Sequence, residues 1–139
     1  MKNRLLLYML LATGSVFAQE VCYLGVGSGS DEKIIEVFKL TDAQIEKMKN
    51  WGAELKYRNS FLEEQAKNLL KQHSESPPEQ LLKMSHKYKV LLDSIQKNMH
   101  MIDQRMLSQF SKDQYNLYIK LCNQVSRTPI FAEPQVNEK

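Results

Sequence analysis

The side chains best suited to metal chemistry are methionine and histidine residues in two short stretches of this 139-residue chain. "NMHMID" at 98–103 contains Met99 and His100, and "KMSHK" places Met84 near His86. Thioether and imidazole groups suit copper(I). On a helix, however, consecutive residues point about 100° apart, and His86 and His100 are about 21 Å apart along the axis. We therefore expect no metal site, with Met99 in the core, and keep Met99 and His100 as weak candidates only.

Patterns that support catalysis are missing from the sequence. It contains no Gly-rich phosphate loop, no strand-turn-helix nucleophile and no pair of histidines at helical spacing. The carboxylates are spread along charged helix faces, often three or four residues from a lysine, as in Glu46–Lys49 and Glu63–Lys67. These features predict a protein that is not an enzyme and that binds no cofactor.

Two cysteines, Cys22 and Cys122, offer one pairing within the chain. In an oxidising compartment such a disulfide persists. Closing a loop of about 100 residues stabilises by roughly 4–5 kcal/mol in the chain-entropy model. We expect this internal bridge, and the alternatives are a bridge between two chains and two free thiols.

Residues 1–18 predict a secretory signal peptide. Lys2 and Arg4 precede an apolar run at 5–12, and small residues place cleavage after Ala18. The run is short of the ~20 residues that a spanning helix needs, which makes a membrane anchor the lesser alternative. Of the 19 basic residues, 17 then remain against 16 acidic ones, and no basic block carries interleaved aromatics. We therefore expect a secreted protein with no membrane span and no nucleic-acid partner.

Helix signals dominate the chain from residue 31 onward, and no run alternates with period two for long enough to make a strand. The prediction is an all-α domain over 31–126 with about four helices. Ahead of it, the Gly/Ser-rich residues 19–30 are expected to be flexible. Behind it, residues 127–139 contain two prolines and are expected to form a loose tail. The expected helices span 31–38, 42–73, 77–109 and 112–126.

Capping boxes predict where three of these helices begin. In a capping box a hydroxyl accepts from a backbone N–H of the first turn, and a Gln or Glu three residues later reaches back to the cap. Pro77 adds a proline where a first helical turn favours one. The three pairs are Thr41 with Gln44, Ser76 with Glu79, and Ser111 with Gln114.

The second and third expected helices carry apolar stripes that predict a long antiparallel hairpin turned at 73–79. Each of these two helices is about 48 Å long at ~1.5 Å per residue. A hairpin this thin needs the short flanking helices, or a second copy of the chain, to cover its surface. The stripes contain Ile45, Met48, Gly52, Leu55, Asn59, Leu62, Ala66 and Leu69, and then Leu81, Tyr88, Leu91, Leu92, Ile95, Met99, Ile102, Met106 and Phe110.

Aromatic side chains lie off the stripe of the second expected helix. Tyr57 and Phe61 are four residues apart on its outer side, beside Lys56 and Arg58, with Trp51 at its flank. One interpretation packs these rings beneath the first or fourth helix. The other is an exposed aromatic patch among charges that binds other chains. On that interpretation the candidate client surface is Trp51, Tyr57, Arg58 and Phe61.

Two short elements, "LTDAQ" at 40–44 and "FSKDQ" at 110–114, resemble the motifs of the Spy/CpxP family of bacterial periplasmic proteins. That family carries two Leu-Thr-x-x-Gln elements, each at the start of a helix. The resemblance covers roughly 31–126, and the cysteine pair is not part of the family pattern. The first element matches at Leu40, Thr41 and Gln44, and the second has Phe110 for Leu and Ser111 for Thr but keeps Gln114.

The resemblance implies a cradle-shaped dimer of bent hairpins in which the two motifs lie near each other and set the angle of the arm. Family members act as ATP-independent chaperones, as regulators of envelope-stress sensor kinases or as metal-responsive proteins. We therefore expect a periplasmic homodimer that binds unfolded or misfolded envelope proteins. The alternatives are a regulatory or metal-responsive partner of an envelope-stress sensor, and a structural helical protein of the envelope.

Overall fold

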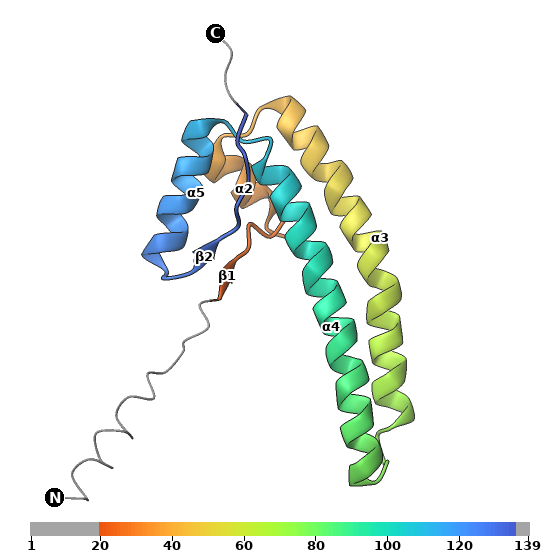
Figure 1. Cartoon of the computed structure of the whole chain (residues 1–139). Helices are drawn as coiled ribbons and strands as arrows, with labels where there is room; N and C mark the ends of the chain where they lie inside the picture. The colour runs from red at the N-terminus through yellow and green to blue at the C-terminus, as the bar shows by residue number, and fades with distance from the viewer. Residues whose placement is uncertain (1–19, 136–139) are drawn as a thin grey trace, which may run out of the picture.

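A computed structural model describes residues 20–135, and the predicted signal peptide lies outside this range. The described chain is mostly helical, which confirms the predicted all-α class (Figure 1). A tiny parallel sheet, with Val21 opposite Thr128 and Cys22 opposite Pro129, is the one addition to the predicted elements. In chain order the elements are β1 (Val21–Cys22), α2 (Asp31–Phe38), α3 (Asp42–Gln72), α4 (Pro78–Leu107), α5 (Lys112–Gln124) and β2 (Thr128–Pro129).

The two long helices α3 and α4 form the predicted antiparallel hairpin, which extends away from the other elements (Figure 1). The buried residues of α3 all lie on the predicted stripe: Met48, Gly52, Leu55, Asn59 and Ala66. In α4 the buried residues lie only in the last two turns, from Ile102 onward. We call residues 56–101 of the hairpin the arm, and the remaining described residues the head.

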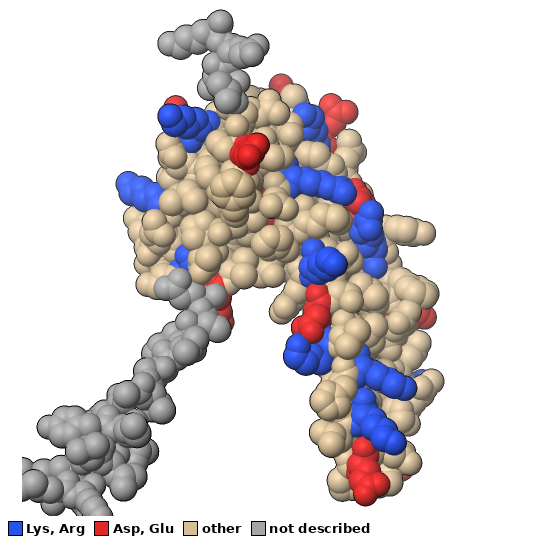
Figure 2. Space-filling view, viewed as in Figure 1, with Lys and Arg blue, Asp and Glu red and all other residues tan. Residues whose placement is uncertain are grey.

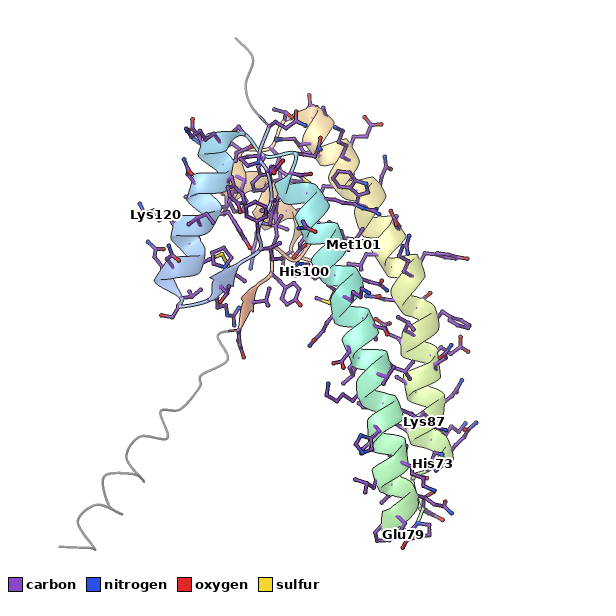
Figure 3. The ribbon with its side chains drawn as sticks, in the orientation of Figure 1. His73, Glu79, Lys87, His100, Met101 and Lys120 are labelled. Carbon is purple, nitrogen blue, oxygen red and sulfur yellow. A yellow bond between two sulfur atoms is a disulfide. The ribbon has the colours of Figure 1, made fainter. Side chains whose placement is uncertain are left out.

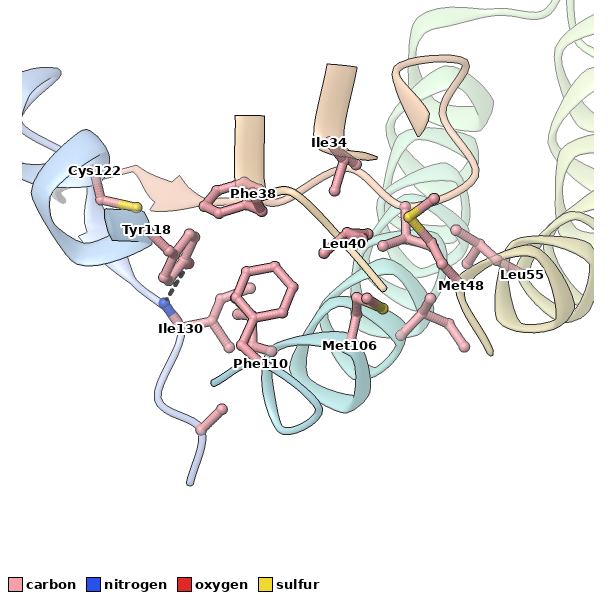
Figure 4. Close-up of a cluster of buried hydrophobic side chains, with 14 residues drawn as sticks. Ile34, Phe38, Leu40, Met48, Leu55, Met106, Phe110, Tyr118, Cys122 and Ile130 are labelled. Carbon is pink, nitrogen blue, oxygen red and sulfur yellow. Dashed lines mark hydrogen bonds between the residues drawn. The ribbon is translucent and has the colours of Figure 1, made fainter. Parts of the chain in front are cut away.

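The core lies in the head, where all four helices of the described chain and the segments around β1 and β2 contribute buried side chains (Figure 4). Met48, Ile102, Met106 and Phe110 are fully buried there. The rings of Phe38 and Phe110 lie 4.9 Å apart between centroids, so the end of α2 packs on the residue before the N-cap of α5. Burying a large apolar side chain contributes about 1.5–3 kcal/mol, so these contacts stabilise the junction of the helices.

The segment at 20–30 differs from the flexible lead-in that the sequence predicted. Val26 is 1% exposed, and its neighbours Leu24 and Gly25 donate backbone hydrogen bonds to the carboxylate of Asp103. At Gly27 (φ 75°) the loop crosses α3 so closely that a Cβ would lie 3.0 Å from the Cα of Gly52. The glycines therefore let the backbone take positive φ and approach a helix, rather than making the segment loose.

The C-terminal tail is also more ordered than predicted over its described part, residues 127–135. Ile130 and Ala132 are 2% and 5% exposed. The hydroxyl of Tyr118 accepts from the N–H of Ile130 at 2.8 Å and donates to the carbonyl of Cys22 at 2.6 Å. The hydroxyl of Tyr115 donates to the carbonyl of Ile130 and accepts from the N–H of Ala132. Two tyrosines of α5 thus hold both terminal segments, a role that no local sequence pattern indicated.

The cysteines form the predicted internal disulfide, Cys22–Cys122, with the two Cα atoms 5.7 Å apart. It joins β1 to the last turn of α5 across 100 residues of sequence. The bridge therefore reinforces the same junction that the tyrosine hydroxyls hold.

The predicted cap at Ser76 and Glu79 is wrong. Pro77 is the N-cap of α4, Pro78 is the first helical residue, and no side chain caps this end. The Ser76 hydroxyl instead lies 3.0 Å from Nδ1 of His73. Two consecutive prolines start the helix one residue later than predicted, which leaves Ser76 too far from the first turn to cap it.

Candidate functional site

The two predicted motifs each form a complete capping box. In the first, Thr41 N–H donates to Oε1 of Gln44 at 3.0 Å, and Gln44 N–H donates to Oγ1 of Thr41 at 3.3 Å. In the second, Ser111 N–H donates to Oε1 of Gln114 at 2.8 Å, and Gln114 N–H donates to the Ser111 hydroxyl at 3.2 Å. Replacing Thr by Ser at the second motif therefore keeps the cap intact.

The two glutamines of the motifs also contact each other. Nε2 of Gln44 donates to Oε1 of Gln114 at 2.8 Å, and Nε2 of Gln114 donates to Oε1 of Gln44 at 3.1 Å. Each amide makes one further bond to backbone: Gln44 to the carbonyl of Gln109, and Gln114 to the carbonyl of Phe38. The first turns of α3 and α5 are thereby joined to each other and to the ends of α4 and α2. Leu40 and Phe110, the apolar residues of the motifs, are both buried in the core of the head.

The surface beside the paired glutamines is a polar hollow of about 350 Å³. Its lining offers amides, hydroxyls and one lysine, and the Nζ of Lys47 bonds to Oε1 of Gln109. Hydrogen bonds already hold the polar side chains of both motifs and join Lys47 to Gln109, so this lining orients the first turns of α3 and α5. The lining residues are Thr41, Ala43, Gln44, Lys47, Gln109, Ser111, Gln114 and Gln135.

Asp103 is a buried carboxylate that the sequence analysis missed. It is 1% exposed, and it accepts from the N–H groups of Leu24, Gly25 and Val26 at 2.7, 2.9 and 3.0 Å. Burial raises its pKa above the ordinary 3.8, while these three hydrogen bonds lower the pKa in part. Asp103 lies on the apolar stripe of α4, between Met99 and Met106. An acidic residue at a core position, in a chain with a glycine-rich segment, was the signal that could have revealed it.

Tyr57 and Phe61 are exposed, as the second interpretation of these rings required. Tyr57 is 82% exposed and Phe61 is 66% exposed, so neither packs beneath α2 or α5. Trp51 is half-buried and packs against the core of the head. The predicted client surface is thus divided: Tyr57, Arg58 and Phe61 lie on the open arm, and Trp51 lies at its base.

Arg58 belongs to a small ion-pair network on the side of the hairpin. Its Nε lies 2.8 Å from Oε1 of Glu54, and Nη1 of Arg105 lies 2.9 Å from Oε2 of the same carboxylate. The hydrogen bond from Arg58 is the main reason that the pKa of Glu54 is lowered. Because Arg105 comes from α4, the network connects the two helices at the base of the arm.

Apolar exposure continues along the arm toward its turn. Val90 is 63% exposed, and a groove of about 440 Å³ between α3 and α4 lies beside it. The groove is lined by Gln65, Asn68, Leu69, Gln72, Lys87, Val90 and Leu91. The other large apolar side chains exposed on the arm are Leu70, Leu81, Leu82 and Leu92.

One polar contact crosses the interior of the hairpin. Nδ2 of Asn98 donates to Oδ1 of Asn59 at 2.9 Å, and Asn59 is 7% exposed. A partly buried asparagine pair favours one register of two helices over others, because any slip leaves an amide unpaired. Asn59, a weak position of the predicted stripe, therefore sets the register of the arm.

The weak metal candidates, Met99 and His100, make different contacts. Met99 packs against the core, and the ring of His100 contacts the edge of Tyr23, with centroids 6.4 Å apart. Figure 3 shows His100 and Met101 near the upper end of α4, far from His73 at the turn. Over residues 20–135, no group of three or more His, Cys, Asp or Glu side chains is placed to hold a metal ion. In the same range no helix is both long and apolar enough to cross a membrane.

Comparisons with family models, with curated proteins and with solved structures find no match to this chain.

Proposed function

We propose that this protein is a chaperone-like protein of the bacterial periplasm that binds unfolded or misfolded envelope proteins along the arm without ATP. The observation that carries the proposal is the exposure of Tyr57 and Phe61 at 82% and 66% on a charged helical surface. The resemblance of the elements at 40–44 and 110–114 to the Spy/CpxP motifs supports the same function.

The division between head and arm suits this role. The head is held by a disulfide, a buried carboxylate and the paired glutamines, and so provides a rigid base. The arm consists of two helices whose outer sides keep large apolar groups in solvent. An unfolded chain offers the same kind of group, and contact between the two buries apolar area at about 25 cal/mol per Å².

Charges on the arm would keep such a complex soluble. Basic and acidic side chains alternate with the exposed apolar groups, as Arg58 does between Tyr57 and Phe61. Apolar contact then holds the client, while charges affect its rate of encounter and its choice of partner. No step in this scheme requires a nucleotide site or a nucleophile.

The test replaces both rings, Tyr57→Ser with Phe61→Ser, and measures light scattering of an aggregating model client. We expect the double variant to suppress aggregation less than the parent does. Its helicity and melting temperature should be nearly unchanged, because exposed substitutions usually cost less than ~0.5 kcal/mol. The matched control is Phe131→Ser, which removes a ring of 73% exposure from the head.

The outcomes separate the alternatives. Equal losses from the arm variant and from Phe131→Ser would place client binding outside the arm. A parent protein that never suppresses aggregation would overturn the proposed function, and a sensor partner or a structural role would then take its place. The homodimer also remains a prediction, which sedimentation of the chain without residues 1–18 measures directly.

A further inference from the structure

Two rows of side chains, one from α3 and one from α4, face the same side of the hairpin. Residues three and four apart share one face of a helix, and each row follows that spacing. The Glu54–Arg105 ion pair of 2.9 Å joins the rows at the base of the arm. The groove between Gln65, Gln72 and Lys87 joins them near the turn. We call this side the front face.

The front face is basic. Its cationic groups are spaced along almost the whole hairpin, and Figure 2, which views this side, shows blue side chains along the arm with red ones between them. Carboxylates also lie on this side: Glu54, which is already paired with two arginines, Asp93, which follows Val90 by three residues and is paired with Lys89, and Glu79 at the turn. Lys87 stands at the edge of the groove (Figure 3). The cationic residues of the two rows are Arg58, Lys83, Lys87, Lys97 and Arg105.

Between these charges the front face has an apolar floor. Leu69 and Leu91 are half-buried at the bottom of the groove, and Val90 stands beside them at 63% exposure. Phe61, two turns away on α3, adds a ring of 66% exposure to the same row. Two packed helices leave such a groove for a third helix, whose apolar stripe would fill it as in a helical bundle.

Resting on the proposed client-binding function, we propose that the front face binds acidic amphipathic helical segments of partner proteins. The apolar stripe of the segment lies over Leu69, Val90 and Leu91. Its flanking Asp and Glu side chains face Lys83, Lys87 and Lys97. The carboxamides of Gln65, Asn68 and Gln72 form the opposite wall, where they hydrogen-bond polar groups of the segment.

Two other occupants fit the charges or the shape less well. A second copy that pairs front face to front face brings cationic rows against cationic rows, and like charges oppose association. An anionic membrane surface matches the charge, but a flat surface does not reach side chains at the bottom of a groove between two helices. A helix with acidic flanks satisfies both requirements.

The probe is a fluorescein-labelled peptide of about 18 residues, which spans ~27 Å as a helix. It carries leucines at helical spacing with Glu on both flanks, and its twin carries Lys at every Glu position. Fluorescence anisotropy with the chain lacking residues 1–18 measures the dissociation constant of each. We expect the Glu peptide to bind at least tenfold more tightly than the Lys peptide, and the difference to shrink in high salt.

Charge reversal locates the binding surface. Lys83→Glu with Lys87→Glu should weaken binding of the Glu peptide at least tenfold and favour the Lys peptide. The matched control, Lys56→Glu with Lys67→Glu, changes net charge equally on the opposite side of α3. It should leave binding within about twofold, because residues 56 and 67 lie about half a helical turn from the front row. Val90→Ser, at a largely exposed position, should weaken both peptides without unfolding the chain.

The proposal is overturned if the two peptides bind alike, or if both charge reversals weaken binding equally. Binding to phosphatidylglycerol vesicles that Lys83→Glu with Lys87→Glu abolishes, without peptide binding, would overturn it in favour of a membrane surface. Self-association lost in the same variant would overturn it in favour of a second copy.

If aggregation is suppressed but the Glu peptide does not bind, the proposed function stands and this occupant fails. If the peptide binds but no client is protected, the front face is a docking site and the chaperone function fails.

Discussion

Gln44 and Gln114 pair through both atoms of their side-chain amides although 70 residues separate them. Each Oε1 also accepts its own cap N–H, at Thr41 and Ser111 respectively. Nε2 of Gln44 also donates to the carbonyl of Gln109, just after α4, and Nε2 of Gln114 donates to that of Phe38, the last residue of α2. Both amides are therefore fully hydrogen-bonded, and the pair joins the first turn of α3 to that of α5.

We expect Gln44→Ala and Gln114→Ala each to lower the free energy of unfolding by about 1–3 kcal/mol, since each leaves partly buried partners unpaired. The double variant should cost less than the sum of the two, with a coupling energy of 0.5 kcal/mol or more, roughly the least seen for contacting residues. Urea denaturation of the four proteins in this cycle measures the coupling. Additive losses would show that the two motifs act independently.

The hydroxyl caps carry a smaller, local share of stability. We expect Thr41→Ala and Ser111→Ala each to destabilise by roughly 0.5–2 kcal/mol, because each leaves a first-turn N–H without its acceptor. Ser76→Ala is the matched control, since Ser76 caps no helix in the structure and should cost less. Thermal melts of the three variants compare them directly. Parent-like melting of both cap variants would contradict the capping account.

Local patterns predicted the helices well because helix periodicity and caps are properties of neighbouring residues. The hairpin, the stripe of α3 and the boxes at Thr41 and Ser111 all followed from spacings of three and four. The cap at Ser76 failed because the double proline, equally local, shifted the helix start. The Cys22–Cys122 pairing was predictable because two cysteines allow one internal bridge.

Features that depend on distant partners were not predictable in the same way. The sequence predicted that residues 20–30 are flexible, because glycine and serine are common in linkers. Backbone N–H groups of this segment nevertheless donate hydrogen bonds to Asp103, near the C-terminal end of α4. The sequence predicted that residues 127–135 form a loose tail, because no local pattern indicates that Tyr115 and Tyr118 hydrogen-bond to their backbone. The exposure of Tyr57 and Phe61 also depended on tertiary structure, since only the arrangement of α2 and α5 decides which part of the hairpin they cover.

The crossing of Gly27 over Gly52 predicts a difference between two otherwise similar substitutions. Gly27→Ala requires an alanine to adopt φ 75° and places its Cβ 3.0 Å from the backbone of Gly52. Gly29→Ala has φ 92° and no atom within 4 Å of the new Cβ. We expect Gly29→Ala to cost about 1–2 kcal/mol from conformation alone. Gly27→Ala should cost a further 1–3 kcal/mol or so from overpacking. Equal losses of unfolding free energy would rule out a tight crossing.

The disulfide should stabilise the head against unfolding. Cys22→Ser with Cys122→Ser is expected to lower the free energy of unfolding by about 2–5 kcal/mol, because the bridge closes a long loop in the unfolded chain. Denaturation of the parent with and without reductant should show a similar difference. A thiol assay on denatured, unreduced monomer should find no free thiol. Two free thiols, or a dimer that separates on reduction, would contradict the internal bridge.

Two carboxylates should respond to acid in opposite directions. Burial raises the pKa of Asp103 above 3.8, so its folded state holds a proton more readily than the unfolded chain does. Its favourable contribution is complete below the unfolded pKa and is lost as the pH rises through the raised folded pKa. Arg58 lowers the pKa of Glu54 from 4.5, so that carboxylate stabilises above its unfolded pKa and loses its effect as the pH falls.

The measurement is unfolding free energy from about pH 3 to 7 for the parent, Asp103→Asn and Glu54→Gln. Asp103→Asn should be destabilised throughout, by about 1–3 kcal/mol, because the amide NH2 that replaces one oxygen accepts no hydrogen bond, whereas both oxygens of Asp103 can accept in either protonation state. Its deficit should be largest at the acid end, where the parent holds the proton, and should narrow as the pH rises. Glu54→Gln should show a deficit that disappears in acid instead. Parallel pH profiles for the two variants would mean that the buried carboxylate titrates like the exposed one, and the account of Asp103 as a desolvated acid would fail.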